Sequence, residues 1–177
     1  MSVRTVVLRV VALALLLLLA LVGVITMRTL QRLPDTLIYF VRDQGTSFTI
    51  EPVVRKAGDA GLSGRVRNQV AALVAGPSAG EAEEGLSSAV PQGVEVRSVD
   101  LSDGTLTVEL SSEFVSGGGT ASMFGRLNQL LYTLSQPSDV DAVVLEIEGE
   151  TLTVLGGEGI IVEVPWVRSE HPELPTW

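Results

Sequence analysis

The sequence of 177 residues contains no cysteine, one histidine (His171) and one lysine (Lys56). The lack of cysteine excludes disulfide bonds, thiolate metal ligands and a cysteine nucleophile. A serine nucleophile needs a neighbouring base, and the two candidates are Lys56 and His171, which lies in a Pro-rich C-terminal segment. We therefore predict that the chain is not an enzyme and has no catalytic residue, no metal site and no cofactor.

Positive charge is scarce beyond the first 33 residues. Residues 1–33 hold four arginines and no acidic residue, whereas residues 34–177 hold eight Lys and Arg against 21 Asp and Glu, a formal net charge of −13 (8 − 21). A domain of that charge repels nucleic acid and anionic lipid headgroups. We expect no nucleic-acid partner.

The uncharged segment 10–27 is the main apolar run of the chain. As a helix rising about 1.5 Å per residue it would span about 27 Å, close to the roughly 30 Å hydrocarbon core of a bilayer. We predict a single-pass anchor in the cell membrane, with the N-terminus in the cytoplasm and the remainder extracytoplasmic; a cleaved signal peptide is the alternative. Residues 1–33 then form the anchor and its tether, 34–164 a domain, and 165–177 a tail with prolines and tryptophans.

Two amphipathic helices are predicted, over residues 62–75 and from Thr120 to about residue 136. Each has an apolar stripe at helical spacing, with Ser63 and Thr120 as candidate N-caps and Gly76-Pro77 as a stop signal. Asn68-Gln69-Val70 of the first helix recurs as Asn-Gln-Leu at 128–130, a shift of 60 residues. This echo is consistent with two β-α-β halves.

Strand patterns predict two hairpins and a further set of strands. Residues 36–42 and 46–54 form the first predicted hairpin, and 94–101 and 106–110 the second, which turns at Asp103-Gly104. The remaining predicted strands are 140–147, 152–155 and 160–164, and residues 78–88 read as an exposed loop. We predict an α+β fold: after the transmembrane helix, one β-α-β-β-α-β-like domain with two helices packed on one face of a mainly antiparallel sheet.

Three groups of residues resemble chemical sites without meeting their requirements. The glycines of residues 156–159 precede a strand, whereas a phosphate-binding loop needs its glycines before a helix, so we expect a turn or bulge there. The four carboxylates between residues 100 and 113 lack the spacing of a calcium loop, and we expect them on solvated strand faces. The paired serines at 87–88 and 111–112 are expected to bond turn backbone.

Several pieces of the soluble part together resemble the GerMN domain, a module of GerM-type sporulation and germination proteins and of envelope lipoproteins of other bacteria. The matching pieces are Ile38-Tyr39-Phe40, Val53-Val54-Arg55, Leu73-Val74-Ala75-Gly76-Pro77, Gly85-Leu86-Ser87-Ser88-Ala89-Val90-Pro91 with Gly93, Asp103-Gly104, Val108-Glu109-Leu110-Ser111 with Phe114, Tyr132-Thr133-Leu134, and Gly156-Gly157-Glu158-Gly159. The resemblance implies a non-catalytic α+β module outside the membrane that acts in envelope assembly or protein–protein contacts, and it supplies no catalytic residue. The chain has room for one copy, whereas the sporulation proteins carry the domain in tandem.

These observations predict a membrane-anchored module that binds another envelope protein or itself, in envelope assembly or a sporulation-like complex. The alternative is a peptidoglycan-binding or other glycan-binding protein, and an envelope hydrolase ranks third. Strand addition at an exposed sheet edge is the expected mode of contact. The predicted interaction surface consists of Gly85, Leu86, Ser87, Ser88, Pro91, Ser111, Ser112 and Phe114.

Overall fold

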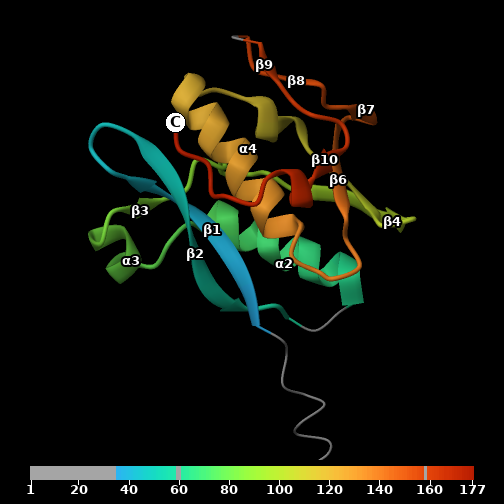
Figure 1. The fold of residues 1–177 in the computed structure, drawn as a ribbon, viewed down its shortest axis with the longest axis horizontal. Coiled ribbons are helices and arrows are strands. Elements are labelled where there is room, and N and C mark those ends of the chain that lie inside the picture. Colours follow the sequence, from blue (N-terminus) through green and yellow to red (C-terminus); the bar gives the residue numbers. More distant parts are fainter. Residues whose placement is uncertain (1–34, 59–60, 158) are drawn as a thin grey trace, which may run out of the picture. The chain divides into compact units, whose positions relative to one another are not determined.

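The computed structural model describes residues 35–58, 61–157 and 159–177 (Figure 1). The predicted membrane-spanning segment 10–27 and its tether lie outside these residues. In the described ranges, no helix combines the length and apolar character needed to cross a membrane. Residues Asp35–Trp177 form one compact unit, so the C-terminal segment belongs to the same body as the strands and helices before it.

The first sheet contains β1 (Asp35–Asp43), β2 (Phe48–Lys56) and β3 (Leu86–Ser87) in the order β2-β1-β3, with antiparallel pairs throughout. The predicted hairpin is confirmed, with Tyr39 opposite Pro52 near its middle. Gly45 in its turn has φ +84°, and its N–H donates to Oδ1 of Asp43 at 2.7 Å.

The second sheet contains β4 (Val96–Ser102), β5 (Thr105–Leu110), β6 (Ala142–Ile147) and β10 (Trp166–Val167) in the order β10-β6-β5-β4, and β7 (Glu150–Thr151) also pairs with β6. The predicted Asp-Gly turn joins β4 to β5. Asp103 and Gly104 have φ values of +49° and +77°, the double positive φ of a type I′ turn, whose twist suits a hairpin. A crossover through a helix makes β5 and β6 parallel.

Both predicted long helices are confirmed, as α2 (Gly61–Ala75) and α4 (Thr120–Leu134). The expected N-cap at Ser63 is wrong, because α2 begins two residues earlier. The N-cap of α4 is Gly119, without a side-chain cap, rather than Thr120. The predicted loop 78–88 is also partly wrong: it contains α3 (Ala79–Glu83), which Ser78 and Glu81 start with a reciprocal capping box, and β3.

The remaining elements are short. They are the 3₁₀ helices η1 (Ser112–Val115) and η2 (Arg168–Glu170) and the small hairpin of β8 (Val154–Leu155) and β9 (Ile160–Ile161), so the strands predicted at 152–155 and 160–164 are shorter than expected. The turn expected at the glycines of residues 156–159 joins β8 to β9, where Gly156 has φ +73°. A side chain at Gly156 would meet Sδ of Met123 at 2.1 Å.

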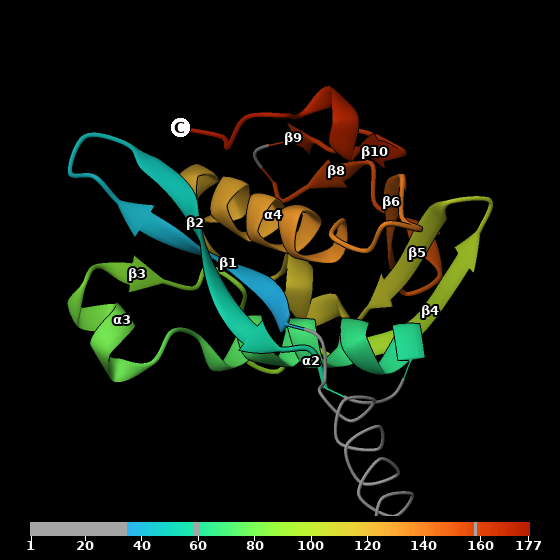
Figure 2. The same ribbon diagram turned by 60° about the horizontal axis from the view of Figure 1, so that its bottom comes forward.

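The α+β class is confirmed, but the prediction of one mainly antiparallel sheet is wrong. The structure has two separate main sheets, and the second is mixed (Figure 2). Two helices lie beside each other, with α4 along β1 and β2 and α2 against β4 and β1. Ten of the fifteen residues of α4 are buried, so this helix is central to the domain rather than a cover on one face.

Candidate interaction site

Almost every residue of the segment Gly85–Gly93 packs against, or forms a hydrogen bond with, the rest of the domain or adopts a backbone conformation that the fold requires. Leu86 and Val90 are buried in the core, with 4% of each side chain exposed. Gly85 and Gly93 have φ of +91° and +84°, the left-handed region that favours glycine. The N–H of Ala89 donates to Oε1 of Gln129 at 2.7 Å. The segment is therefore held rigidly against the core.

The same segment also closes the C-terminal end of α2. Oγ of Ser88 donates to the carbonyl oxygen of Leu73 at 2.6 Å, and Nε2 of Gln92 donates to that of Val74 at 2.5 Å. These carbonyls belong to the last turn of the helix and have no partner within it. As the sequence led us to expect, the hydroxyl of Ser88 forms a hydrogen bond with the backbone.

The second predicted stretch, Ser111–Phe114, follows β5. Ser111 is 1% exposed, its N–H donates to the carbonyl oxygen of Glu95 at 3.0 Å, and its Oγ accepts from the N–H of Glu95 at 3.0 Å. Phe114 in η1 is fully buried. Ser112, between them, is exposed.

Arg126 of α4 joins the two stretches. Its Nε donates to the carbonyl oxygen of Ala89 at 3.1 Å, and its terminal nitrogens donate to those of Phe114, Ser116 and Gly117 at 2.5, 3.1 and 3.0 Å. The side chain is 2% exposed and no carboxylate pairs with it in the part of the chain that the structure describes. Burial lowers the pKa of the guanidinium from its usual value. The buried Arg126 side chain thus fixes the positions of the two loops relative to each other.

The predicted surface residues fall into three groups. Gly85, Ser87 and Ser112 are exposed, and Ser88 and Pro91 are half-buried. The side chains of Leu86, Ser111 and Phe114 are buried, so they support this surface from beneath. We call the exposed and half-buried members, Gly85, Ser87, Ser88, Pro91 and Ser112, the loop surface.

Side chains cover the part of β1 that β3 does not pair with and part of the free edge of β4. Along β1, the N–H of Leu37 donates to Oε1 of Gln136 at 2.7 Å, and the N–H of Tyr39 to Oγ1 of Thr133 at 3.1 Å. At β4, Arg67 donates to the carbonyl oxygens of Val96 and Arg97, and a register shift marks a bulge there. Both devices hinder strand addition at these edges.

A hollow adjoins the loop surface. Its volume is 350 Å³, and it lies between the ends of β1 and β3, the start of β2 and the first turn of α4. Its walls combine apolar side chains with three hydroxyls. They are Val41, Phe48, Ser87, Ser88, Ala89, Ala121 and Ser122.

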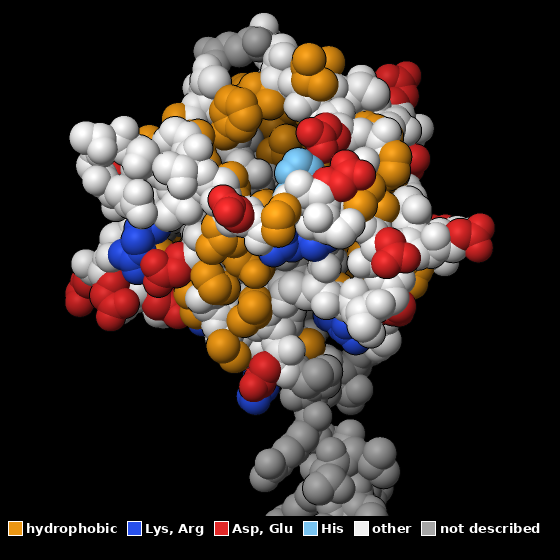
Figure 3. Space-filling view, in the orientation of Figure 1, with side chains coloured by type: hydrophobic (Ala, Val, Ile, Leu, Met, Phe, Trp, Pro, Cys, Tyr) orange, Lys and Arg blue, Asp and Glu red, His pale blue; other side chains and the backbone are white. Residues whose placement is uncertain are grey.

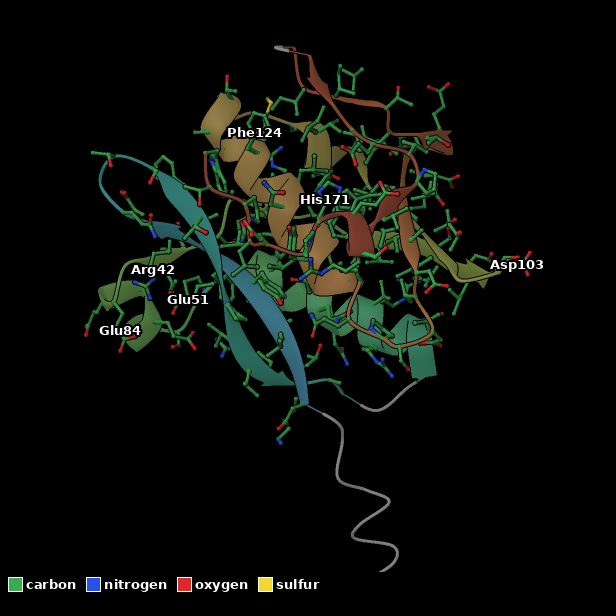
Figure 4. All side chains as sticks on the ribbon, in the orientation of Figure 1. Arg42, Glu51, Glu84, Asp103, Phe124 and His171 are labelled. Carbon is green, nitrogen blue, oxygen red and sulfur yellow. The ribbon has the colours of Figure 1, made fainter. Side chains whose placement is uncertain are left out.

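One ion pair and one hydrogen bond to backbone hold α3 and the adjoining turn against the first sheet. Nη2 of Arg42 donates to Oε1 of Glu51 at 3.0 Å, and Nη1 donates to the carbonyl oxygen of Glu84, where Figure 4 shows the three residues together. Arg55 of β2 donates to Glu81 of α3 with two nitrogens, one at 2.8 Å. Hydrogen bonds from Arg55 and from the N–H of Ser78 lower the pKa of Glu81 to about 2.

The groups considered for catalysis or metal binding are dispersed. Asp103 lies at the tip of the β4–β5 hairpin (Figure 4), far from His171, and acidic side chains scatter over the face seen in Figure 3. Nε2 of His171 is 2.9 Å from Oε2 of Glu163, and its ring stacks on Trp166 with centroids 5.0 Å apart. Within residues 35–58, 61–157 and 159–177, no three His, Asp or Glu residues are placed to hold a metal ion.

The sequence did not point to the residues that organise this site. Arg126 and Gln129 lie on an amphipathic helix, where a polar residue is normally solvated. The one available signal was the 60-residue echo, because its two glutamines, Gln69 and Gln129, are 1% and 0% exposed. Nε2 of Gln69 donates to Oγ1 of Thr36 at 2.8 Å and to the carbonyl oxygen of Thr133 at 2.9 Å.

The fold and the site together define an α+β module in which two short sheets enclose a central helix and two loops share one buried arginine. The chain matches a family model described as "Germane: Sporulation and spore germination" over residues 37–153. The chain belongs to this family, and the GerMN-type domain indicated by its motifs is confirmed. Comparison with curated protein sequences gives no match.

Solved structures with the same fold include the first GerMN domain of the sporulation protein GerM from Bacillus subtilis, with a TM-score of 0.62 and 19% identity over 77% of this chain and 98% of that one. The tandem GerMN domains of the same protein match with a TM-score of 0.58 and 20% identity, over 75% of this chain. The match covers 44% of the tandem chain. A protein from Clostridium perfringens assigned as a lipoprotein matches with a TM-score of 0.52 and 20% identity, over 77% of this chain and 89% of that one.

Proposed function

We propose that this chain is a non-enzymatic, membrane-anchored protein whose GerMN domain lies outside the membrane and binds another envelope protein or a second copy of itself. The loop surface is the proposed contact. The observation that carries the proposal is the buried Arg126, which fixes the two loops to each other through four backbone carbonyls. A rigid, preformed surface loses little conformational entropy on binding.

The relatives support the cellular setting of this proposal. A structural neighbour is a sporulation protein and another is assigned as a lipoprotein, a class of protein held at a membrane. In this chain, we propose that the apolar segment 10–27 provides the membrane attachment, because its length matches the hydrocarbon core of a bilayer. The process that we propose is envelope assembly or a sporulation-like complex.

The mode of contact follows from the state of the sheet edges. Because β1 and β4 are covered by side chains near the loop surface, we propose a side-chain contact there rather than addition of a strand to either edge. The hollow of 350 Å³ beside Ser87 and Ser88 would accept one side chain of the partner. Its apolar walls and three hydroxyls suit a residue that is mainly apolar.

Glycan binding is the second candidate and has less support. Sugar rings normally stack on exposed aromatic side chains, whereas Tyr39, Tyr132 and Trp166 are 8%, 3% and 4% exposed. Phe124, with 38% exposed, is the one exposed aromatic residue in the part of the chain that the structure describes. Among the described residues, the hydroxyls and carboxylates form no arrangement that favours hydrolysis.

A crosslinking experiment in living cells tests the proposal. A photo-reactive amino acid replaces Ser87 in the full chain, because Ser87 is exposed whereas Oγ of Ser88 is bonded to Leu73. We expect an adduct that a protease degrades and a wall hydrolase does not. An adduct that only a wall hydrolase releases would favour glycan binding and contradict the protein-binding proposal.

A fractionation experiment tests the anchor separately. The full chain is expected in the membrane fraction, and a variant lacking residues 10–27 is expected outside it. Protease added to intact cells with a permeable wall should degrade the domain. Recovery of the full chain in the supernatant, or protection of the domain from protease in sealed cells, would contradict the proposed attachment or orientation.

A further inference from the structure

The C-terminal segment of the chain lies as an added strand on the outer edge of β2. The N–H of Phe48 donates to the carbonyl oxygen of Trp177 at 2.9 Å, and the N–H of Trp177 donates to that of Phe48 at 3.0 Å. Oγ1 of Thr49 also donates to the carbonyl oxygen of Pro175 at 2.8 Å, and Thr49 and Thr176 form an antiparallel bridge. This segment therefore shows how an extended peptide can pair with the outer edge of β2.

Trp177 fills an aromatic slot between β2 and α4. Its ring stacks on Phe48 with centroids 6.2 Å apart, and Nε1 donates to the carbonyl oxygen of Ala121 at 3.0 Å. That carbonyl lies in the first turn of α4. The slot thus recognises both the flat ring and the indole N–H.

The slot continues into the hollow beside the loop surface. Phe48 and Ala121, which contact Trp177, also line the hollow. Gly125 of α4 lies beneath both: a Cβ there would be 3.3 Å from Cζ2 of Trp177, 3.0 Å from Cγ2 of Val41 and 3.3 Å from Cβ of Ala89. One groove therefore runs from the β2 edge to Ser87, with Trp177 in one half and the other half open.

The bound segment is held at few points. Its middle residues, Pro172, Glu173 and Leu174, are exposed, where Oη of Tyr132 donates to the carbonyl oxygen of Glu173 at 2.6 Å, and the hydrogen bond from Trp177 to Ala121 is itself solvent-accessible. Segments held by exposed hydrogen bonds and few apolar contacts open at low free-energy cost. Further along β2, Pro52 has no N–H to offer, so an added strand is confined to the end near Phe48.

We propose that this groove binds an extended segment of a partner protein that carries an aromatic side chain shortly after a proline, and that residues 172–177 occupy the groove until the partner displaces them. The proposal rests on the proposed function, because it gives the class of partner segment and the regulation of the same surface. The partner's aromatic ring takes the place of Trp177, its backbone pairs with Phe48, and its neighbouring side chain enters the open hollow next to Ser87.

The test uses the full chain in detergent and a variant that ends after His171. The probe is a peptide with the sequence of residues 171–177, labelled with fluorescein at its N-terminus, and binding is followed by anisotropy. We expect the shortened chain to bind the peptide at least tenfold more tightly than the intact chain. A peptide with Trp177→Ala should bind at least tenfold more weakly, whereas one with Leu174→Ala should bind equally well because that side chain is 41% exposed.

Equal binding to both chains, or no loss with Trp177→Ala, would overturn the proposal. If the shortened chain does not fold, hydrogen exchange on the intact chain tests whether the segment opens separately. The amides of Phe48 and Trp177 are expected to exchange at least 100-fold faster than that of Tyr39, and equal rates would show that the segment does not open separately. An adduct from Ser87 to an envelope protein without any effect of the truncation would refute this proposal and leave the proposed function standing.

Discussion

The carbonyl oxygen of Tyr39 accepts a hydrogen bond from Nε2 of Gln129 at 3.0 Å, although the two residues lie 90 positions apart in the chain. The N–H of Tyr39 is bonded by Thr133, one helical turn further along α4. Side chains of α4 therefore form the hydrogen bonds to the backbone of β1 that a neighbouring strand would otherwise form. This arrangement explains why the domain has two sheets, and it places α4 where Arg126 can reach both loops.

Gln129→Met should destabilise the domain by about 2–3 kcal/mol. The substitution keeps the length of the side chain but leaves the buried carbonyl of Tyr39 and the half-buried N–H of Ala89 without partners, which costs about 1–3 kcal/mol for a fully buried group. Urea denaturation measures the loss. Asn128→Ala is the matched control on the same helix and should change the free energy of unfolding by less than about 0.5 kcal/mol. Equal effects would contradict the role of Gln129.

Arg126→Met should cost about 2–4 kcal/mol, because four backbone carbonyls lose a charged donor. The substitution should loosen the two loops more than the rest of the domain. We expect hydrogen exchange to rise in segments 88–90 and 114–117 while β5 and β6 stay protected. Arg97→Met, at a half-exposed ion pair with Glu95, is the control and should be close to neutral. Unchanged exchange in both loops would show that Arg126 does not organise the site.

The contact between α3 and β2 should weaken in acid. The pKa of Glu81 is about 2 in the folded protein, below its ordinary value of 4.5, because Arg55 and Ser78 bond the carboxylate. A lowered pKa means that the stabilisation is complete above pH 4.5 and is lost as pH falls towards 2. Glu81→Gln should cost about 1 kcal/mol at pH 7, discounted for solvent screening, and this difference should shrink below pH 4. A difference that stays constant between pH 7 and 3 would contradict the assignment.

Two glycines with positive φ should respond unequally to alanine. Gly45 has open space around it, so Gly45→Ala should cost only the backbone strain, about 1 kcal/mol. At Gly104, a Cβ would lie 2.5 Å from Oδ2 and 3.2 Å from Cγ of Asp141, which also donates its N–H to the carbonyl oxygen of Gly104 at 2.8 Å. Gly104→Ala should therefore lower the melting temperature further than Gly45→Ala, and an equal or smaller effect would refute this packing.

Local patterns predicted much of this fold. The apolar stripes located both long helices, and Asp103-Gly104 and Gly76-Pro77 marked a hairpin turn and a helix end, because these signals depend on neighbouring residues alone. The strand sequences did not reveal that β5 and β6 are parallel or that β1 belongs to another sheet. The first depends on pairing across a helical crossover, as between Thr105 and Ala142, and the second on hydrogen bonds between residues 90 positions apart, such as Tyr39 and Gln129.

The candidate site was predicted only in outline. The segments 85–93 and 111–114 were recognised as unusual, and they do lie together, but Leu86, Ser111 and Phe114 owe their pattern to packing inside the domain. Sequence alone gives no means of separating a residue that supports a surface from one that forms it. The sequence pattern around Arg126 is also the same as that of a solvated arginine on a helix. Its partners are backbone carbonyls, which have no sequence signature.

The most direct measurement compares photo-crosslinking from Ser87 and Ser112 in the full chain, with Asp103 at the distant hairpin tip as the control position (Figure 4). Arg126 ties both loops into one surface, so we expect that Ser87 and Ser112 give adducts to the same envelope protein, or to a second copy, and that Asp103 does not. Different partners from the two serines, or the same adduct from Asp103, would contradict a single interaction surface built from these loops.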